Sequence, residues 1–298
     1  MRTRFLALIL ALPAIPAAGQ APPSADLWRL SASSLSGPAS LERGPAAAFW
    51  NPAAPDLSRR FSVGAELTQT PDVIGVAGFV GAVHYRLRPG LAATALVARV
   101  DLDDIVRTTT SATSDLGTIP IYAQLVGVGV VVAAGSMQAG ALVRGHDARF
   151  DALRESGVTV DAGARIALHK RLTVAGATHF LPVNLKSRDL TDYYLGADFL
   201  VTSRRMFGGI THFHLRYGAT HREATGTDHG VGLGLRFNDD LGVEVSVVRE
   251  DGIVESAMRP VVGLALRVGR YLIRAGRAAG LNDIGASYRI GLESDILR

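Results

Sequence analysis

From about Arg60 to the end of the chain, apolar and polar residues alternate with a period of two through one short segment after another. In residues 158–168 the even positions are apolar, whereas the odd positions include Asp161 and Arg165. Successive side chains of a β-strand point to opposite faces, so this pattern predicts strands with one apolar and one polar face. The pattern recurs around residues 231–237, and the chain is therefore expected to be all-β.

Turn-forming residues divide this region into about fourteen strands, with twelve or sixteen as the alternative counts. They are expected at 60–70, 73–87, 91–102, 121–134, 137–146, 158–168, 171–181, 192–202, 208–220, 229–237, 241–249, 261–268, 270–277 and 284–293. Tight connections alternate with longer, more polar ones, which are expected at 103–120, 146–156, 182–190, 221–228, 250–259 and 277–283. An even strand number with tight turns on the periplasmic side and long loops outside is typical of outer-membrane barrels.

Residues 1–20 read as a secretory signal peptide. Arg2 and Arg4 form its charged start, residues 5–12 its apolar core and residues 17–19 a small-residue cleavage site. The apolar core is too short for a transmembrane helix, and no later segment is long enough. A signal peptide followed by alternating strands predicts a transmembrane antiparallel β-barrel in the outer membrane of a Gram-negative-type bacterium, with outer-membrane lipid around it.

The composition agrees with this class. Cysteine is absent, so the chain holds together by hydrogen bonds and packing instead of disulfides. The formal charge of +4 falls to +2 once Arg2 and Arg4 are removed, and basic residues are interleaved with acids, so nucleic acid is not an expected partner. A secreted β-sandwich or propeller is the soluble alternative, but apolar sets in nearly every strand would overfill a small sandwich core.

Residues 21–59 lack the alternating pattern of the expected barrel at 60–298 and are expected to form a separate N-terminal hatch segment. The stretch 44–54 contains Phe49, Trp50, Asn51 and Pro52 in succession. An Asn-Pro step starts a turn, because proline pushes the residue before it away from helical geometry. The two aromatic side chains are unfavourable in water, so this stretch is expected to pack against or inside the barrel.

A Gly/Ala run leading to an aromatic residue and then Asn-Pro-Ala, directly before the first strand, resembles the N-terminal signature of the FadL-like outer-membrane superfamily. That superfamily contains long-chain fatty-acid transporters and PorV/PorQ-type proteins, and the resemblance implies a periplasmic hatch. Asn51 and Pro52 would fix the hatch turn, with Phe49 and Trp50 as its apolar anchors. A barrel-entry turn without a transport role is the alternative. The chain is shorter than the fatty-acid transporters, which favours the PorV/PorQ-type branch.

The polar strand faces collect charges of both signs, Arg99 and Asp101 among them, and are expected to line the lumen. The candidates for a ligand path are His212, His214, Arg216, Arg236, Arg267, Arg274 and Arg289. For any one of them, an ion pair that holds the wall in shape is the ordinary interpretation. As a group, the four C-terminal arginines would form a basic patch for an anionic head group, since guanidinium binds carboxylate bidentately.

No metal, cofactor or catalytic site is predicted. His212 and His214 share a strand face, but no cysteine or carboxylate stands at a recognisable metal-site spacing nearby, so a hydrogen-bonded lumen cluster is expected. The acidic run 101–104 lacks the glycine and terminal glutamate of an EF-hand loop. Neither a Gly-x-Ser-x-Gly elbow nor a His-Glu-x-x-His motif occurs, so an enzyme is not expected.

Two functions remain. The first is passage of hydrophobic or amphipathic small molecules across the outer membrane, which predicts an apolar pocket between hatch and wall. The second is a PorV/PorQ-like role in secretion or surface attachment, in which the barrel binds exported proteins and needs no continuous path.

Overall fold

The computed structural model describes residues 25–71, 75–102, 105, 117–183, 191–206, 208–222, 226–238, 240–251, 256–280 and 285–297, with the backbone alone at 25, 26, 30 and 31. The expected signal peptide at 1–20 lies outside these residues. So do most of the expected connection 103–120 and nearly all of 182–190.

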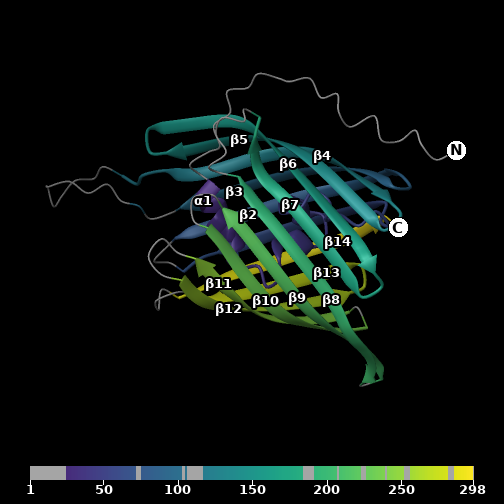
Figure 1. The fold of residues 1–298 in the computed structure, drawn as a ribbon. Coiled ribbons are helices and arrows are strands. Elements are labelled where there is room, and N and C mark those ends of the chain that lie inside the picture. Colours follow the sequence, from purple (N-terminus) through teal and green to yellow (C-terminus); the bar gives the residue numbers. More distant parts are fainter. Residues whose placement is uncertain are drawn as a thin grey trace.

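The described chain forms a closed antiparallel barrel of fourteen strands, which confirms the expected fold class (Figure 1). The strands are β1 (Phe61–Gln69), β2 (Val76–Arg88), β3 (Leu91–Leu102), β4 (Ile121–Ala134), β5 (Met137–Phe150), β6 (Leu153–His169), β7 (Leu172–Pro182), β8 (Asp192–Met206), β9 (Gly209–Arg222), β10 (Gly226–Phe237), β11 (Leu241–Asp251), β12 (Ser256–Val268), β13 (Tyr271–Ala279) and β14 (Ala286–Leu297). Each pairs with the next, and β14 closes the ring against β1 in a register that runs from Phe61 opposite Leu297 to Gln69 opposite Tyr288.

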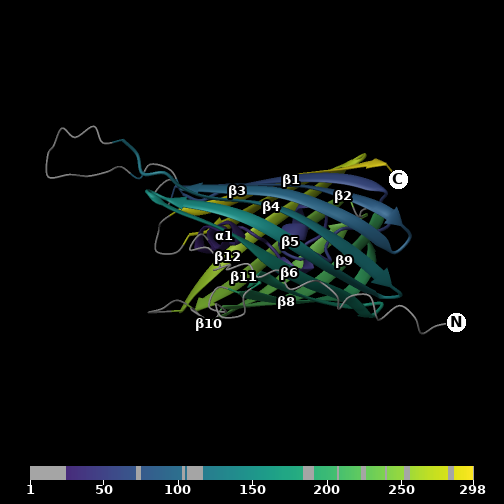
Figure 2. The ribbon, with the colours of Figure 1, turned by 90° about the horizontal axis from the view of Figure 1, so that it is seen from above.

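The two ends of the barrel differ in their connections. One end, here the tight-turn end, carries the connections at 89–90, 135–136, 170–171 and 269–270, together with the start of β1 and the end of β14. Gly90, Gly135 and Gly269 have φ between +61° and +76° there, the left-handed region that glycine adopts without steric cost. The other end, the loop end, carries the connections that follow β1, β3 and the other odd-numbered strands. Figure 2 shows the two ends from above.

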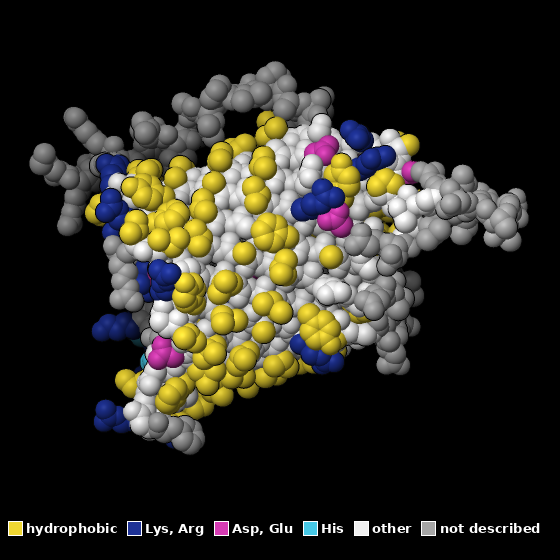
Figure 3. Space-filling model, turned by 180° about the vertical axis from the view of Figure 1, so that it is seen from behind, with side chains coloured by type: hydrophobic (Ala, Val, Ile, Leu, Met, Phe, Trp, Pro, Cys, Tyr) yellow, Lys and Arg dark blue, Asp and Glu magenta, His cyan; other side chains and the backbone are white. Residues whose placement is uncertain are grey.

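Most outward side chains are apolar. Leu67, Val126, Val128, Leu233 and Ile290 are all more than half exposed although each lies within a strand. Figure 3 shows the resulting apolar surface over one face of the barrel. Exposed aromatic residues lie towards both ends: Tyr85 and Tyr271 near the tight turns, and Phe79, Tyr193, Tyr217 and Tyr288 nearer the loop end. An apolar band between two aromatic girdles is typical of the surface that a transmembrane β-barrel presents to lipid.

The lumen is filled by residues 25–59, which we call the plug. It contains the helix α1 (Ala25–Ala32) and two 3-10 turns, η1 (Ala39–Leu41) and η2 (Ala46–Phe49), joined by irregular segments. Figures 1 and 2 both place α1 within the ring of strands. Among the described helices, none has the length and apolar character needed to cross a membrane.

The inner wall is not uniformly polar. On β2 to β5, inward positions include the buried Val80, Leu96, Leu125 and Leu142, and these belong to one apolar core with Trp28 of the plug. Both faces of these strands are therefore apolar, one towards the exterior and one towards the plug. An alternating pattern shows only that the two faces of a strand differ in polarity. It therefore cannot predict an inner face that is apolar because it packs against the plug.

Two sequence expectations need correction here. Arg99 and Asp101 do not line the lumen; they are in phase with the outward Val97 and form an ion pair of 2.6 Å on the exterior. The expected loop at 146–156 is instead the end of β5, a two-residue turn and the start of β6. Its charged residues mislead because Asp147 faces outward and binds Gln124 on β4 at 3.2 Å, while Ala148 is buried inside.

The connections expected at 221–228 and 250–259 are also shorter than their predicted ranges. Here β9 and β10 extend to Arg222 and Gly226, and β11 and β12 to Asp251 and Ser256. The polar residues in these ranges continue the strand ladders beyond the apolar band. A run of polar residues therefore shows where a strand passes beyond the apolar band. It does not show where the strand itself ends.

Candidate functional site

The plug follows the inner wall so closely that the wall carries glycine where the two meet. A β-carbon built on any of these glycines would lie within 3.0 Å of a plug atom. The pairs are Gly276 with Ser34, Gly263 with Ser36, Gly218 with Pro38, Gly196 with Ser40, Gly163 with Asn51, and Gly140 with Pro52. Residues 34–40 thus pass in order along β13, β12, β9 and β8. The glycines on these strands make room for the plug, for its main chain at Ser34 and Pro52 and for its side chains at the other four contacts.

Wall side chains also supply the hydrogen bonds that an irregular segment lacks, since each buried main-chain carbonyl needs a donor. Six donors do so. They are Arg259 to the Ser33 carbonyl, Ser246 to Ser36, Arg165 to Leu41, Arg144 to Phe49, Gln138 to Pro55, and Arg86 to Ser58. The plug is consequently held around much of the barrel circumference instead of at a single point.

The strongest attachment lies at Arg144 of β5, whose side chain is fully buried. Its guanidinium forms an ion pair with Asp161 of β6 and donates to the Phe49 carbonyl at 2.5 Å. The same group lies over the Phe49 ring, 4.6 Å from its centroid, and 2.5 Å from Nε2 of His179 on β7. Breaking a buried ion pair by removing one partner costs about 3–5 kcal/mol, so this cluster anchors the plug firmly.

Asp161 also stabilises the main chain of the neighbouring strand β7. It sits in a β-bulge between β6 and β7, and its carboxylate accepts the main-chain N–H of Phe180 at 2.9 Å. Phe180 has φ of +57°, a conformation rare for a residue with a β-carbon. The carboxylate therefore stabilises the bend in β7 that brings His179 and Phe180 against the plug aromatics.

The four expected hatch residues lie in the centre of the lumen, and all are buried. Phe49 and Trp50 pack together, with ring centroids 4.7 Å apart. Asn51 accepts the N–H of Ala53 at 2.9 Å through its side-chain oxygen and donates to the Ser40 carbonyl at 2.7 Å. Asn51 thus closes the turn at Pro52 and joins the two halves of the plug.

The helix α1 is attached through Arg29, which binds the buried carboxylate of Asp192 on β8 with Nε at 3.1 Å and Nη2 at 2.8 Å. The next residue towards the N-terminus, Trp28, packs on Phe49 with a centroid distance of 5.1 Å. Arg29 therefore attaches this helix to β8, and Trp28 attaches it to the hatch.

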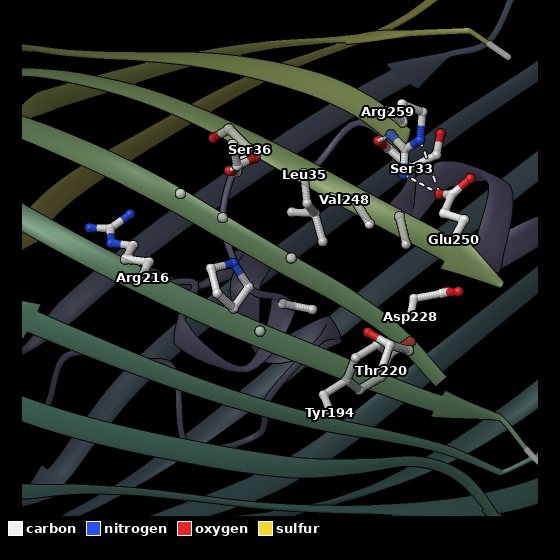
Figure 4. Close-up of a pocket in the computed structure, with 18 of the residues that line it drawn as sticks. Ser33, Leu35, Ser36, Tyr194, Arg216, Thr220, Asp228, Val248, Glu250 and Arg259 are labelled. Atoms are coloured by element: carbon white, nitrogen blue, oxygen red, sulfur yellow. Dashed lines mark hydrogen bonds and ion pairs between the residues drawn. The ribbon is translucent and has the colours of Figure 1, made fainter. Parts of the chain in front are cut away.

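Among the described residues, the lumen contains two cavities that flank the plug, one towards each end of the barrel. The loop-end cavity has a volume of about 100 Å³ and lies between residues 29–39 of the plug and strands β8 to β12 (Figure 4). Val248 and Leu35 provide apolar surface, whereas Glu250 and Arg259 form an ion pair at its rim. Figure 4 shows Arg259 reaching from β12 to both Ser33 and Glu250.

The tight-turn-end cavity is larger, with a volume of about 800 Å³, and extends to the turn residues Gly135 and Ser136. Its lining is strongly charged. The arginines are Arg43, Arg59, Arg165, Arg216, Arg236, Arg267, Arg274 and Arg289, and the acids are Glu42, Asp56, Asp198, Asp240, Glu244 and Glu293.

A thin partition divides the two cavities. The residues that line both of them are the plug segment 35–38 and the wall pair Arg216 and Glu244. Arg216 Nη1 lies 2.5 Å from Glu244 Oε2, so the pair bridges β9 and β11 across the intervening β10. We call residues 35–38 together with this ion pair the septum.

The four C-terminal arginines expected to form a basic patch all line the tight-turn-end cavity. Three of them are ion-paired: Arg267 with Asp295 at 3.6 Å, Arg274 with Glu293 at 3.1 Å, and Arg289 with Glu66. Arg236 lines the same wall. The structure thus brings the group together, with three of its charges compensated by acids on the wall.

His212 and His214 lie on β9 with ring centroids 6.4 Å apart. His214 Nδ1 is 2.7 Å from Asp198, and His212 Nδ1 is 2.8 Å from the hydroxyl of Ser203. Across the described ranges, no group of three or more histidine, cysteine or acidic side chains is placed to hold a metal ion.

The sequence interpretation missed Arg144 and Arg43. Arg144 is in phase with the inward Leu142, and a charge beside this apolar inward position was the signal that could have found it. Arg43 lies in the plug, outside any periodic segment, so no pattern pointed to it. Burial lowers the pKa of Arg43, and the nearby charge of Arg236 lowers it further.

No family model matches this chain, and no curated protein does. Solved structures with a similar fold include outer membrane protein Omp33 of Acinetobacter baumannii, which is 9% identical with a TM-score of 0.47 over 80% of this chain and 98% of that one. A mutant of the Rh. blastica porin is 8% identical, with a TM-score of 0.43 over 79% and 99%. The KdgM porin is 10% identical, with a TM-score of 0.36 over 78% and 98%.

Proposed function

We propose that this protein is an outer-membrane barrel that passes small amphipathic molecules along the β8 to β12 side of its lumen. The observation that carries the proposal is the septum, because a short irregular segment and one ion pair separate the two cavities. The apolar band and its aromatic girdles support the membrane location. The hatch-like plug supports kinship with the FadL-like proteins. That kinship would make hydrophobic molecules part of the range of substrates that this barrel passes.

The opposite side of the lumen offers no comparable path among the described residues. There Leu96, Leu125 and Leu142 pack with Trp28 and Phe49 in one continuous core. Opening that side would expose several large apolar side chains to water, and each Å² of apolar surface exposed costs about 25 cal/mol of free energy. The lowest-cost route therefore runs past the septum.

The septum segment 35–38 is held by few main-chain hydrogen bonds. Ser246 donates to the Ser36 carbonyl at 2.8 Å, Leu35 N–H donates to the Ala32 carbonyl at 3.1 Å, and the Pro38 carbonyl accepts from Leu41 N–H at 2.9 Å. Each such bond contributes about 1 kcal/mol net, far less than the buried ion pair of Arg144. In this proposal residues 35–38 move while the hatch at 49–52 stays in place.

The test is swelling of proteoliposomes in arabinose, an uncharged solute. Leu35→Ala shortens the septum side chain, whereas Leu96→Ala makes the same change on the sealed side. We expect L35A to raise the swelling rate severalfold over wild type and L96A to leave it unchanged. Equal rates for L35A and L96A would contradict passage at the septum. No swelling from any variant would favour the exported-protein partner role.

A disulfide distinguishes movement of the septum from movement of the hatch. A β-carbon on Gly64 would lie 3.5 Å from Cβ of Ala46, a separation that suits a disulfide. Since the chain has no cysteine, the pair A46C and G64C can be oxidised selectively. Oxidation should leave the rate of L35A unchanged. A rate that falls to background would assign the movement to the hatch.

A further inference from the structure

The outer face of strands β2 to β6 carries a hollow that opens towards the exterior of the barrel. It has a volume of about 720 Å³, and outward residues such as Phe79, Val126 and Val158 line it. Gly145 belongs to this lining and is in phase with the exposed Val143, so it also faces outward. Within 4 Å, a β-carbon on Gly145 would meet only Val126, at 3.9 Å. The missing side chain therefore leaves room within the apolar band.

The strand register orders the outward residues around this hollow in rows. Going towards the loop end, the first row is apolar and the second is polar. The rows are Val126, Gly145 and Val158, and then Gln124, Asp147 and Ser156. Successive outward residues of one strand are about 7 Å apart, because a strand rises about 3.4 Å per residue. The surface thus changes from apolar to polar over a short distance, as a lipid does between its acyl chain and its head group.

Arg149 of β5 and Arg154 of β6 lie directly opposite each other in the third row, and we call them the arginine pair. They share the outward face with Asp147 and Ser156, two residues away on each strand. Within the described ranges, neither arginine forms an ion pair within 4.0 Å, and Arg149 donates through Nε to the Asp151 carbonyl at 2.8 Å. Like charges directly opposite on one face of a sheet destabilise it, so an anion that bridges the pair would be stabilising.

The acidic residues of the same outward surface have other partners. Asp147 accepts from the side-chain nitrogen of Gln124 at 3.2 Å. Asp101 of β3 forms an ion pair with Arg99 at 2.6 Å, and Arg99 donates in turn to Gln124 at 3.1 Å. Glu155 lies on the inner face of β6, opposite a buried residue of β5. The acids are therefore gathered in a network towards β3 and β4, and the arginine pair stands beside it on β5 and β6.

We propose that the hollow and the arginine pair bind one phosphate-bearing lipid of the outer leaflet. Its acyl chain lies in the hollow across Gly145, and its phosphate bridges the arginine pair, since guanidinium groups hold phosphate through paired hydrogen bonds. The apolar row lies deeper in the band than the arginines, in the order that a lipid requires. The loop end of a barrel with short periplasmic turns faces outside, which assigns the lipid to the outer leaflet.

A phosphate-bearing lipid is the occupant that uses both parts of this surface. A soluble phosphate would contact the arginine pair and leave the hollow empty. An uncharged lipid would fill the hollow and leave the two arginine charges opposed. The site is separate from the plug and the septum, so the inference goes beyond the passage of small molecules and rests only on the membrane location of the barrel.

The test is native mass spectrometry of the full mature chain in an uncharged detergent, with dioleoyl phosphatidic acid as the probe. Dioleoylglycerol has the same acyl chains without the phosphate. We expect a one-to-one complex with phosphatidic acid that is at least about tenfold tighter than the complex with dioleoylglycerol. Arg154→Gln should weaken the phosphatidic acid complex by about tenfold. Gly145→Leu should weaken it by a similar factor, because the new side chain occupies the hollow.

The matched control is Arg249→Gln, which removes an exposed arginine of β11 that forms an ion pair with Asp251, away from the hollow. It should change the affinity by less than about twofold. Each variant is compared only after an unboiled SDS gel shows a folded barrel. Equal losses in R154Q and R249Q would disprove the site, as would equal binding of the two lipids or unchanged binding in G145L. Displacement of the lipid by an equal concentration of inorganic phosphate would also disprove it, because the arginine pair alone would then account for binding.

Discussion

Gly163 of β6 lies directly against Asn51 of the plug: a β-carbon on Gly163 would be 2.0 Å from Oδ1 of Asn51. Asn51 is fully buried and already uses this oxygen to accept the Ala53 N–H. The wall and the hatch turn are therefore fitted to each other at a position where neither has room to yield.

Replacing Gly163 by alanine should displace the hatch turn. The added methyl group requires Asn51 to move, which breaks its bonds to Ala53 and to the Ser40 carbonyl. We expect trypsin to cleave the plug at Arg43 severalfold faster in G163A than in wild type, measured by mass spectrometry of the intact barrel. Gly145→Ala is the control, because its β-carbon meets only Val126 at 3.9 Å. Equal cleavage of the two variants would contradict the tight fit.

Replacing Arg144 by methionine should destabilise the whole protein. The change leaves the Asp161 carboxylate buried without its cation and the Phe49 carbonyl without its donor. The free energy of unfolding in urea, measured in lipid vesicles, should fall by about 3–5 kcal/mol. Arg99→Met removes an exterior arginine and should change it by less than about 0.5 kcal/mol. A small loss in R144M would mean that the cluster does not anchor the plug.

The closed barrel should resist SDS until it is heated. Its fourteen strands are all paired, so there is no free edge at which detergent unfolding can begin. Unboiled protein is expected to migrate faster on an SDS gel than boiled protein. Identical migration of the two samples would count against a barrel with this closure.

The end of the plug should loosen in acid. Burial raises the pKa of Asp56, but hydrogen bonds from Ser58 and the charge of Arg59 outweigh it and hold the pKa below its ordinary value of 3.8. The ionised carboxylate is therefore favoured in the folded state. Its contribution is fully present above pH 3.8 and is lost as the pH falls through the lowered pKa.

Hydrogen exchange of the Ser58 amide, corrected for the intrinsic pH dependence of exchange, measures this effect. Protection should decrease below pH 3.8, because this amide donates to Asp56 at 2.9 Å. Asp56→Asn should lower the protection at about pH 7, where the wild-type carboxylate is ionised, and remove its acid dependence. Protection that is independent of pH in wild type would refute the role of the carboxylate.

Much of the barrel could be predicted from local pattern. The outward Val231, Leu233 and Leu235 alternate with inward Gly230, Gly232 and Gly234, and such periodicity follows from strand geometry alone. The hatch was located by Phe49 to Pro52, since two aromatics beside an Asn-Pro turn need burial. Arg99 was wrongly predicted to line the lumen, because a charged residue in an alternating strand does not by itself indicate whether its face points inward or outward.

The sequence by itself determined the strand number, the antiparallel order and the presence of a plug segment, because these follow from period-two alternation, turn residues and chain length. Only the tertiary structure decided what the inner faces meet. The pairing of Arg144 with Asp161 and the contact of Gly163 with Asn51 join residues from different elements of the fold. Barrel closure and the path of the plug set those distances, and no local pattern records them.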